Sequence, residues 1–333
     1  MLAVLVTLGF TVEALAAQET RLLRRPTVSH REVAFAYAGD LWIVSRQGGK
    51  ARRLTATPAV ETDPRFSPDG SQLAFTATVG GNTDVYVMAA AGGEVRRLTY
   101  HPGYDMARGW TPDGRRVIFS SSRAAVPAPV VSSFVRLWTI GLEDRQAQML
   151  PMPRAHTGSL SPDGSRIAYE EIATEFETKE AHLQSAQWRH YRGGRTHPIR
   201  LLNIADHSEV VLPWRDSNDS DPMWVGDVIY FVSDRNFTAN LYAYHVHGGK
   251  LEQVTKHDDF DIMSASSGSD AVVYEQGGFI HLLDVRSGVS RRLRVQVEGE
   301  FPWAQPQSKP AGDLLRTVAL SSDGSRAAIE ARG

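Results

Sequence analysis

A sequence pattern repeats along this 333-residue chain, and four of its copies carry an aspartate at a similar position. Each lies in the segment that leads into an expected strand: Asp63, Asp105, Asp221 and Asp261. If the repeats are related by rotation, equivalent positions form a ring, and we expect these carboxylates to gather around one mouth of a central channel. Such a patch would attract a cation or the basic parts of a peptide. The alternative is that each aspartate accepts backbone N–H bonds within its own turn.

The motifs of common catalytic and metal sites do not occur in the sequence. It contains no Gly-x-Ser-x-Gly, no His-Glu-x-x-His and no phosphate-binding glycine loop. The chain has 0 cysteines, which excludes thiol catalysis and cysteine-based zinc sites. His245 and His247 could share a strand face, but no third ligand is visible, and residues 216–221 lack the glycine and glutamate of a calcium loop. We therefore predict no catalytic residue, metal or cofactor.

The charge of the chain gives no reason to expect nucleic acid as a partner. The formal net charge is -2, so a global basic field is missing. Paired arginines, Arg52-Arg53 and Arg96-Arg97, lie on expected outer strands and invite a nucleic-acid interpretation. Edge strands, however, need charge to discourage pairing with other chains, and we expect that role here.

The elements that position the aspartates are defined by a repeated turn. Its clearest copy is Ser67-Pro68-Asp69-Gly70, and similar copies follow Trp110, Leu160 and Leu320. Proline fixes φ, aspartate bonds its own backbone, and glycine accepts the conformation that closes a type I turn. Each copy therefore predicts two strands joined by a tight hairpin.

The repeat has the length of a propeller blade. Second strands are expected near Val33, Leu73, Val117, Ile167, Val228, Val272 and Ala327, at spacings of about 40 to 60 residues. A third strand, a glycine turn and a fourth strand follow in most copies. We predict an all-β fold, a six-bladed β-propeller of four-stranded antiparallel blades over residues 26–300.

Three segments depart from the repeat. An insertion of roughly twenty residues between Ile172 and Pro198 is first acidic and then basic and aromatic, a pattern typical of functional or disordered loops. Residues 301–313 form an expected linker, and residues 314–333 form the first hairpin of a further repeat. That hairpin either completes the ring by pairing with blade one or begins a second propeller.

The first 17 residues resemble a secretory signal peptide. They are apolar from Leu2 to Phe10, and Ala14-Leu15-Ala16 fits the small-residue cleavage pattern. No Lys or Arg precedes the apolar run, so a short apolar tail of a cytoplasmic protein is the alternative. With cleavage, we expect a periplasmic or secreted protein without a membrane segment.

The repeats resemble those shared by the TolB propeller and the tricorn protease. The resemblance rests on Leu-Thr, then Phe66-Ser67-Pro68-Asp69-Gly70, then Asp84-Val85-Tyr86-Val87-Met88. The tricorn family is similar from about Arg24 to Leu293, including the run Trp188 to Gly194. TolB would add a mixed α/β domain ahead of its propeller, whereas only about eight residues separate the expected cleavage site from blade one.

The tricorn resemblance implies a role in peptide degradation. That family is a large serine protease, hexameric in some members, in which this propeller precedes a second one and the catalytic domains. An arginine pair beside the third blade helps hold the carboxyl end of the substrate, and here the loop 104–109 carries only Arg108. The chain would be a peptide-filtering or docking ring, inactive alone, whose partners are peptides and the remaining protease domains.

Two other interpretations remain at this point. One is a free-standing periplasmic propeller of TolB type that docks a partner protein. The other is an autonomous hydrolase, which ranks below both because the sequence names no nucleophile together with its base.

Overall fold

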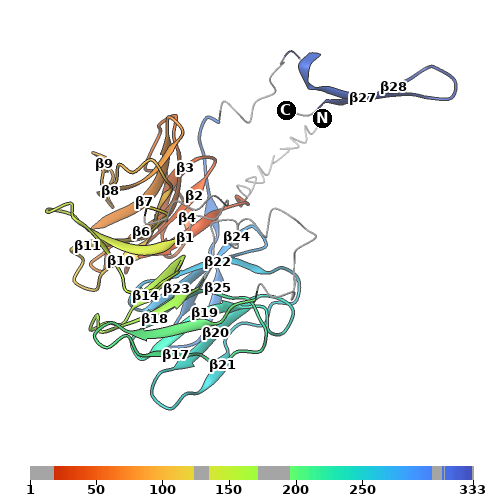
Figure 1. Cartoon of the computed structure of the whole chain (residues 1–333). Helices are drawn as coiled ribbons and strands as arrows, with labels where there is room; N and C mark the ends of the chain where they lie inside the picture. Colours follow the sequence, from red (N-terminus) through yellow and green to blue (C-terminus); the bar gives the residue numbers. More distant parts are fainter. Residues whose placement is uncertain (1–18, 124–134, 172–195, 302–309, 311, 332–333) are drawn as a thin grey trace, which may run out of the picture. The chain divides into compact units, whose positions relative to one another are not determined.

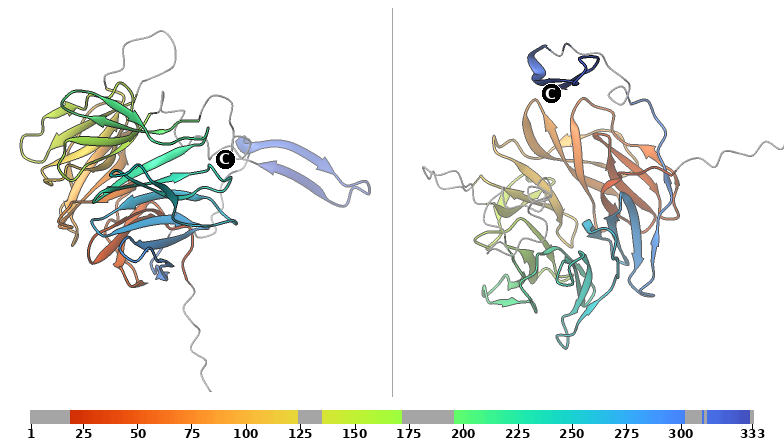
Figure 2. Two further views of the ribbon diagram at one scale, coloured as in Figure 1. Left: turned by 90° about the horizontal axis from the view of Figure 1, so that it is seen from below. Right: turned by 90° about the vertical axis from the view of Figure 1, so that its right-hand side faces the viewer.

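The computed structural model describes residues 19–123, 135–171, 196–301, 310 and 312–331. It divides into two compact units, residues 1–297 and 298–333, which are treated separately here. The first unit contains six four-stranded antiparallel sheets, the blades of a propeller (Figures 1 and 2). The described residues include no α-helix, and so none that could cross a membrane. The predicted all-β, six-bladed propeller is confirmed.

The strands of each blade follow one another from the innermost to the outermost. Blade one has β1 (Arg24–Val28), β2 (Glu32–Tyr37), β3 (Asp40–Ser45) and β5 (Arg52–Arg53), and blade two has β6 (Val60–Phe66), β7 (Gln72–Val79), β8 (Asn82–Ala89) and β9 (Arg96–Arg97). Blade three has β10 (Asp105–Trp110), β11 (Arg116–Ser121), β12 (Arg136–Gly141) and β13 (Ala147–Met149), and blade four has β14 (Thr157–Leu160), β15 (Arg166–Glu170), β16 (Ile199–Asn203) and β17 (Glu209–Val211). Blade five has β18 (Asp219–Val225), β19 (Val228–Ser233), β20 (Asn240–His245) and β21 (Leu251–Gln253), and blade six has β22 (Ile262–Ser267), β23 (Ala271–Gln276), β24 (Phe279–Asp284) and β25 (Ser290–Arg292).

One buried aromatic ring anchors the second strand of every blade. These rings occupy equivalent positions and are at most 1% exposed: Phe35, Phe75, Phe119, Tyr169, Phe231 and Tyr274. Apolar side chains of neighbouring blades pack against each other around them. Burying such a ring removes a large apolar area from water, so the core lies between the blades rather than at the axis.

The repeated turn forms the hairpin that the sequence predicts. The Ser67 hydroxyl donates to Asp69 Oδ1 at 2.5 Å, and the same oxygen accepts the N–H of Ser71 at 3.0 Å. Gly70 has φ +73°, which favours glycine. These hydrogen bonds stabilise the ionised carboxylate and lower the pKa of Asp69 to about 2.

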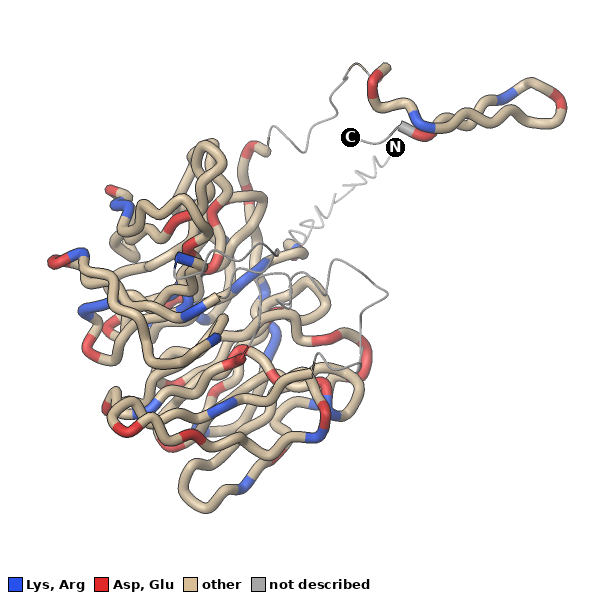
Figure 3. The backbone as a smooth tube through the Cα atoms, viewed as in Figure 1, with Lys and Arg blue, Asp and Glu red and all other residues tan. Residues whose placement is uncertain are grey.

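The outer-strand arginines contact residues of the propeller itself. Arg53 Nη2 lies 2.6 Å from Asp40 Oδ2, and Arg97 Nη2 lies 2.5 Å from Asp84 Oδ2, with both aspartates buried. Arg96 donates to the carbonyl of Leu142 in the next blade at 2.9 Å. Basic and acidic positions are interspersed over the blades in Figure 3. The paired arginines therefore hold buried carboxylates and neighbouring blades together, beyond the edge protection expected of them.

A short strand closes the ring. β26 (Val295–Gln296) pairs in parallel with β4 (Gly49–Lys50) of blade one. The N–H of Thr20 donates to Val295 O and the N–H of Val297 donates to Thr20 Oγ1, both at 2.8 Å. β26 therefore joins the last blade to the first. In the second unit, β27 (Leu315–Leu320) and β28 (Ala327–Ala331) pair with each other in a two-stranded sheet.

A half-buried histidine of blade six, His281, has an altered pKa. The ring of His281 stacks on Tyr274 with centroids 5.0 Å apart, and the ring of His257 meets its edge at 5.5 Å. Burial, followed by the positive charges of His257 and Arg292, lowers the pKa of His281 from 6.5 to about 4. The folded protein therefore binds fewer protons here than the unfolded chain between pH 6.5 and 4.

We expect this histidine to weaken the fold in mild acid. Because its folded-state pKa is depressed, the stability it contributes is present above pH 6.5 and is lost as the pH falls toward 4. His281→Phe keeps the stacking and removes the proton, so the thermal midpoint of the variant should decline less over this window. Thermal melts followed by circular dichroism measure both slopes. Parallel slopes for the two proteins would refute the assignment.

Candidate functional site: the axial channel

A cavity of about 510 Å³ runs along the propeller axis. Every blade contributes an innermost-strand residue to its wall: Thr27, Arg65, Arg108, Ser159, Asp221 and Ser266. The space between the six innermost strands is therefore hollow in this region, which a filtering role requires.

Hydrogen bonds between neighbouring innermost strands fix the channel wall. The N–H of Phe66 donates to Thr27 Oγ1 at 3.3 Å, and the N–H of Trp224 donates to Ser159 Oγ at 3.0 Å. Ser266 Oγ donates to the carbonyl of Pro26 at 2.7 Å and connects blade six to blade one. Because the bonds join different blades, the spacing of the strands around the axis is fixed by polar contacts as well as by the apolar core.

Three charged residues occupy one equivalent position within the innermost strands. Arg25, Asp63 and Asp221 each precede a proline, and each has φ +50°. Each also lies within a register shift of its strand pair. A positive φ at a residue other than glycine is uncommon and persists only where the surroundings impose it. In a regular strand, side chains alternate between the two faces of the sheet. The bulges interrupt this alternation at the three charged residues.

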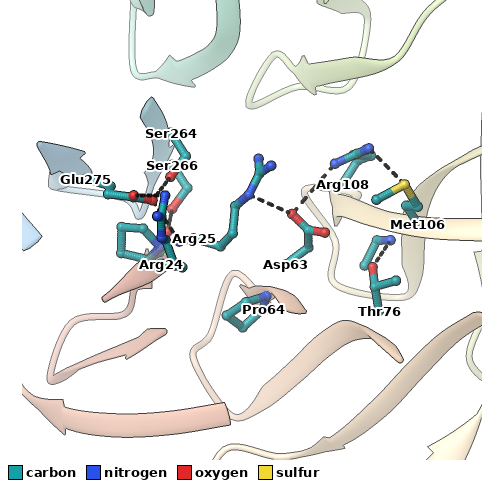
Figure 4. Close-up of polar contacts among 12 residues, drawn as sticks. Arg24, Arg25, Asp63, Pro64, Thr76, Met106, Arg108, Ser264, Ser266 and Glu275 are labelled. Atoms are coloured by element: carbon teal, nitrogen blue, oxygen red, sulfur yellow. Dashed lines mark hydrogen bonds and ion pairs between the residues drawn. The ribbon is translucent and has the colours of Figure 1, made fainter. Parts of the chain in front are cut away.

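Asp63 lies between two arginines (Figure 4). Its Oδ1 is 3.8 Å from Arg25 Nε and 3.7 Å from Arg108 Nη1, and the side chains of Asp63 and Arg108 are each 2% exposed. Arg108 also donates to Ser120 Oγ at 3.1 Å, and its Nη2 lies 2.6 Å from His156 Nε2. Arg108 is therefore surrounded by groups of the protein itself. It is the residue to which the tricorn resemblance assigned the carboxyl end of the substrate.

A second carboxylate anchors the start of blade one. Glu275 Oε1 accepts from Arg24 Nη1 at 2.8 Å, and its other oxygen accepts the N–H of Arg25 at 3.4 Å (Figure 4). In the same way, Glu170 of blade four accepts the N–H of Asp221 at 3.4 Å and contacts His197 Nε2 at 2.9 Å. Glutamates of the second strands thus hold the bulges of the following blades.

Arg65 and its charged neighbours together include more arginines than aspartates. Its near neighbours are Arg25, Arg108, Asp63 and Asp221, so these five groups carry three positive and two negative charges, a sum of +1. Burial lowers the pKa of Arg65 and the two aspartates oppose that shift, but an arginine remains charged at neutral pH. Arginines of the bulges and strands therefore lie beside the carboxylates of the predicted acidic patch. Ligand binding by these residues stays a prediction.

The other two predicted aspartates lie away from this cluster. Asp105 is the first residue of β10, is fully buried and forms an ion pair with Arg123. Asp261 precedes β22 and accepts the N–H of Ala239 at 2.9 Å, as the backbone-bonding alternative proposed. Neither residue lies in a bulge, so the strand geometry that places Asp63 beside the axis does not apply to them.

The two weak metal signals have structural explanations. His245 Nε2 lies 2.9 Å from Glu252 Oε1, and His247 Nε2 lies 3.6 Å from Asp227 Oδ1, so the histidines have separate partners. Asp219, within the calcium-like run, is paired with Arg235. No group of three ligands that could hold a metal ion occurs in the part of the chain that the structure describes. The expected signal peptide, nearly all of the blade-four insertion and most of the linker lie outside the described residues.

The sequence contains a signal for Arg25 in the pattern of charged residues before proline. Arg25-Pro26, Asp63-Pro64 and Asp221-Pro222 repeat a charged residue before proline at the same step of three blades. A pattern restricted to acidic residues includes Asp63 and Asp221 but not Arg25. Arg65 has no such signal, because the equivalent positions of the other blades carry different residue types.

A family model describes this fold and most of this chain. The tricorn protease N-terminal beta propeller domain matches residues 20–289. A putative tricorn protease homolog 2 of Streptomyces coelicolor is 30% identical over 316 residues, which cover 93% of this chain and 26% of that protein. The tricorn protease of Thermoplasma acidophilum is 24% identical over 79% of this chain and 24% of its own length. The chain thus spans about a quarter of these curated relatives.

Solved structures agree on the architecture. The crystal structure of the tricorn protease superposes with a TM-score of 0.70 at 21% identity, over 90% of this chain and 28% of that one. TolB from Acinetobacter baumannii gives a TM-score of 0.53 at 19% identity, over 69% of this chain and 53% of that one. These structural likenesses show the propeller fold. The family model decides between the tricorn and TolB resemblances, because it is the tricorn propeller that matches the chain.

Proposed function

The chain belongs to the tricorn protease family, whose N-terminal propeller domain it represents, and from this premise we propose that its axial channel admits short unfolded peptides and excludes folded proteins. The single observation that carries the proposal is the cavity of about 510 Å³ bounded by all six innermost strands. Cavities of roughly 300–1,000 Å³ accommodate ligands of small-molecule size, which a folded domain far exceeds.

The charges of the channel favour peptides that carry a carboxylate. Arg65 donates through Nε to the carbonyl of Arg108 at 3.2 Å and through Nη1 to that of Pro64 at 3.0 Å. Because carbonyls do not neutralise it, its charge is the one that brings the sum of the five groups to +1. A guanidinium in partly dry surroundings binds a carboxylate strongly. Acidic side chains or free carboxyl ends would therefore be retained longer than basic ones.

Several parts of the proposal concern the longer protein. We propose that the peptides pass to remaining domains of a tricorn-like serine peptidase, since the relatives are about four times as long. We also propose that the protein is exported to the periplasm and assembles into a homo-oligomer.

The test compares two peptides that differ only in charge. Fluorescent pentapeptides with a central glutamate or a central lysine, otherwise glycine and capped at both ends, are titrated with the full chain by anisotropy. We expect the glutamate peptide to bind about 10-fold more tightly or better, and Arg65→Gln to remove that preference, since a charge-assisted bond contributes about 1.5–3 kcal/mol. Arg286→Gln, on an exposed turn, is the matched control. Equal affinities for both peptides, unchanged in Arg65→Gln, would refute the charge selection, and no binding of either would refute the channel proposal.

A further inference from the structure

Blades one and six lack the Ser-Pro-Asp-Gly turn, and their first hairpins meet at the seam of the ring. The hairpin between β1 and β2 carries His30, and the hairpin between β22 and β23 carries Ser269 and Asp270. His30 and Ser269 both line the axial cavity. In blades two, three and four the aspartate of the turn bonds within that turn, whereas Asp270, in the shorter turn of blade six, contacts Arg46 of the neighbouring blade.

These three residues form a nucleophile, a base and a carboxylate in series. Ser269 Oγ lies 3.0 Å from His30 Nε2, a hydrogen-bond distance. The opposite ring nitrogen, His30 Nδ1, lies 3.8 Å from Asp270 Oδ1. Arg46 Nη1 binds both oxygens of Asp270 at 3.0 Å and so fixes the carboxylate. The order of atoms is the one by which a histidine activates a serine hydroxyl.

We propose that Ser269 is an activated nucleophile that accepts acyl groups from ester substrates at this mouth of the channel. His30 is the general base, and Asp270 is a positioning residue that orients the imidazole. The sequence alone gave no nucleophile with its base, because these residues are some 240 positions apart and meet only when the ring closes. This activity goes beyond the peptide channel and does not depend on it.

The proposed reaction uses only an ester, water and these side chains. Ser269 Oγ attacks the ester carbonyl carbon while its proton moves to His30 Nε2. The carbon–oxygen bond to the leaving group breaks, the departing oxygen takes the proton from His30, and the acyl group stays on Ser269. Water then attacks the acyl carbon, gives one proton to His30 and releases the carboxylic acid, and His30 returns the proton to Ser269.

The surroundings predict a slow reaction with accessible substrates. Ser269 is exposed, and the side chains of His30 and Asp270 are 62% and 43% exposed, so small esters reach the hydroxyl without any rearrangement. Water competes for the same hydrogen bonds, and Arg46 shares the carboxylate that orients His30. General base assistance contributes about 10²–10⁴-fold in enzymes, and we expect the lower end of that range here. Esters and fluorophosphonates with good leaving groups are the appropriate probes.

Covalent labelling identifies the reacting residue directly. The full chain is incubated with a fluorophosphonate, digested and analysed by mass spectrometry, and p-nitrophenyl acetate hydrolysis is followed in parallel. We expect the adduct on Ser269, no adduct there in Ser269→Ala, and labelling at least 10-fold slower in His30→Gln. Asp270→Asn should slow labelling several-fold while Asp270→Glu restores it, which a merely structural carboxylate would not do.

The control separates a reactive hydroxyl from an ordinary one. Ser71 is an exposed serine in the second blade's turn, where it bonds Asp69 rather than a histidine, so Ser71→Ala should leave labelling unchanged. Equal modification of Ser269 and Ser71 would overturn the proposal, as would unaltered Ser269 labelling in His30→Gln. Because the variants lie in exposed turns, matched thermal midpoints verify that each protein is folded. A negative result here leaves the peptide titration unaffected, since Arg65 takes no part in it.

Discussion

Replacing Asp219 with alanine is expected to lower the free energy of unfolding by about 3–5 kcal/mol, which is much of the stability of an ordinary domain. The carboxylate is 0% exposed and lies 2.8 Å from Arg235 Nη2, whose side chain is 5% exposed. Its other oxygen accepts hydrogen bonds from the hydroxyls of Ser217 and Ser233, at 2.8 and 2.5 Å. The alanine variant leaves the guanidinium buried without its counter-ion, and that uncompensated charge is the source of the loss.

Chemical denaturation measures this loss, and two further variants identify its cause. Asp227→Ala removes an aspartate that is 80% exposed and should change the free energy of unfolding by less than about 0.5 kcal/mol. Asp219→Ala combined with Arg235→Met removes both charges and should recover part of the loss, because no unpaired ion remains. If the single variant loses less than about 1 kcal/mol, the buried pair does not support blade five as argued.

Ending the chain after Leu293 is expected to lower the thermal midpoint by roughly 10 °C or more. The truncation removes β26 and with it four hydrogen bonds to the N-terminal segment and blade one. Val295, which is 0% exposed, is lost as well. At about 1 kcal/mol per hydrogen bond and 1.5–3 kcal/mol for a buried valine, the total is about 6 kcal/mol. A domain of this size shifts its midpoint by about 2–4 °C per kcal/mol.

A second truncation provides the comparison for this prediction. Ending the chain after Val297 keeps β26 and all of its bonds and removes only the second unit. We expect its midpoint to lie within about 2 °C of that of the full chain. Scanning calorimetry of the two truncated proteins gives both values, and similar midpoints for the two would show that β26 does not close the ring in solution.

The fold could be predicted because local and global signals agree. Blades two, three and four repeat the same turn chemistry, so Ser67, Asp69 and Gly70 form their hairpin with bonds confined to six residues. The buried aromatic position of each second strand follows from the alternation of side chains between the two faces of that single strand. The closing strand had no such signal, because β26 is two residues long and its partner, β4, lies in the first blade.

The channel was harder to predict because it depends on bulges. A single extra residue changes which side chains face the axis, so Asp63 reaches the cluster whereas Asp105, in a similar sequence position, enters the core of its blade. Ser269 and His30 illustrate a second limit. Their meeting depends on the angle at which blade six returns to blade one, and no pattern within either hairpin encodes that angle.

The seam of the ring also has a kinetic consequence. The bond between Val297 and Thr20 connects residues 277 positions apart, and closing a loop of that length costs roughly 5 kcal/mol of chain entropy. The seam therefore forms last during folding, after the blades themselves. At roughly 5–20 residues per second of synthesis, β4 waits some tens of seconds for β26 to leave the ribosome. During that interval the edge of blade one can pair with another nascent chain, so the aggregation hazard of this propeller belongs to its biosynthesis rather than to its native state.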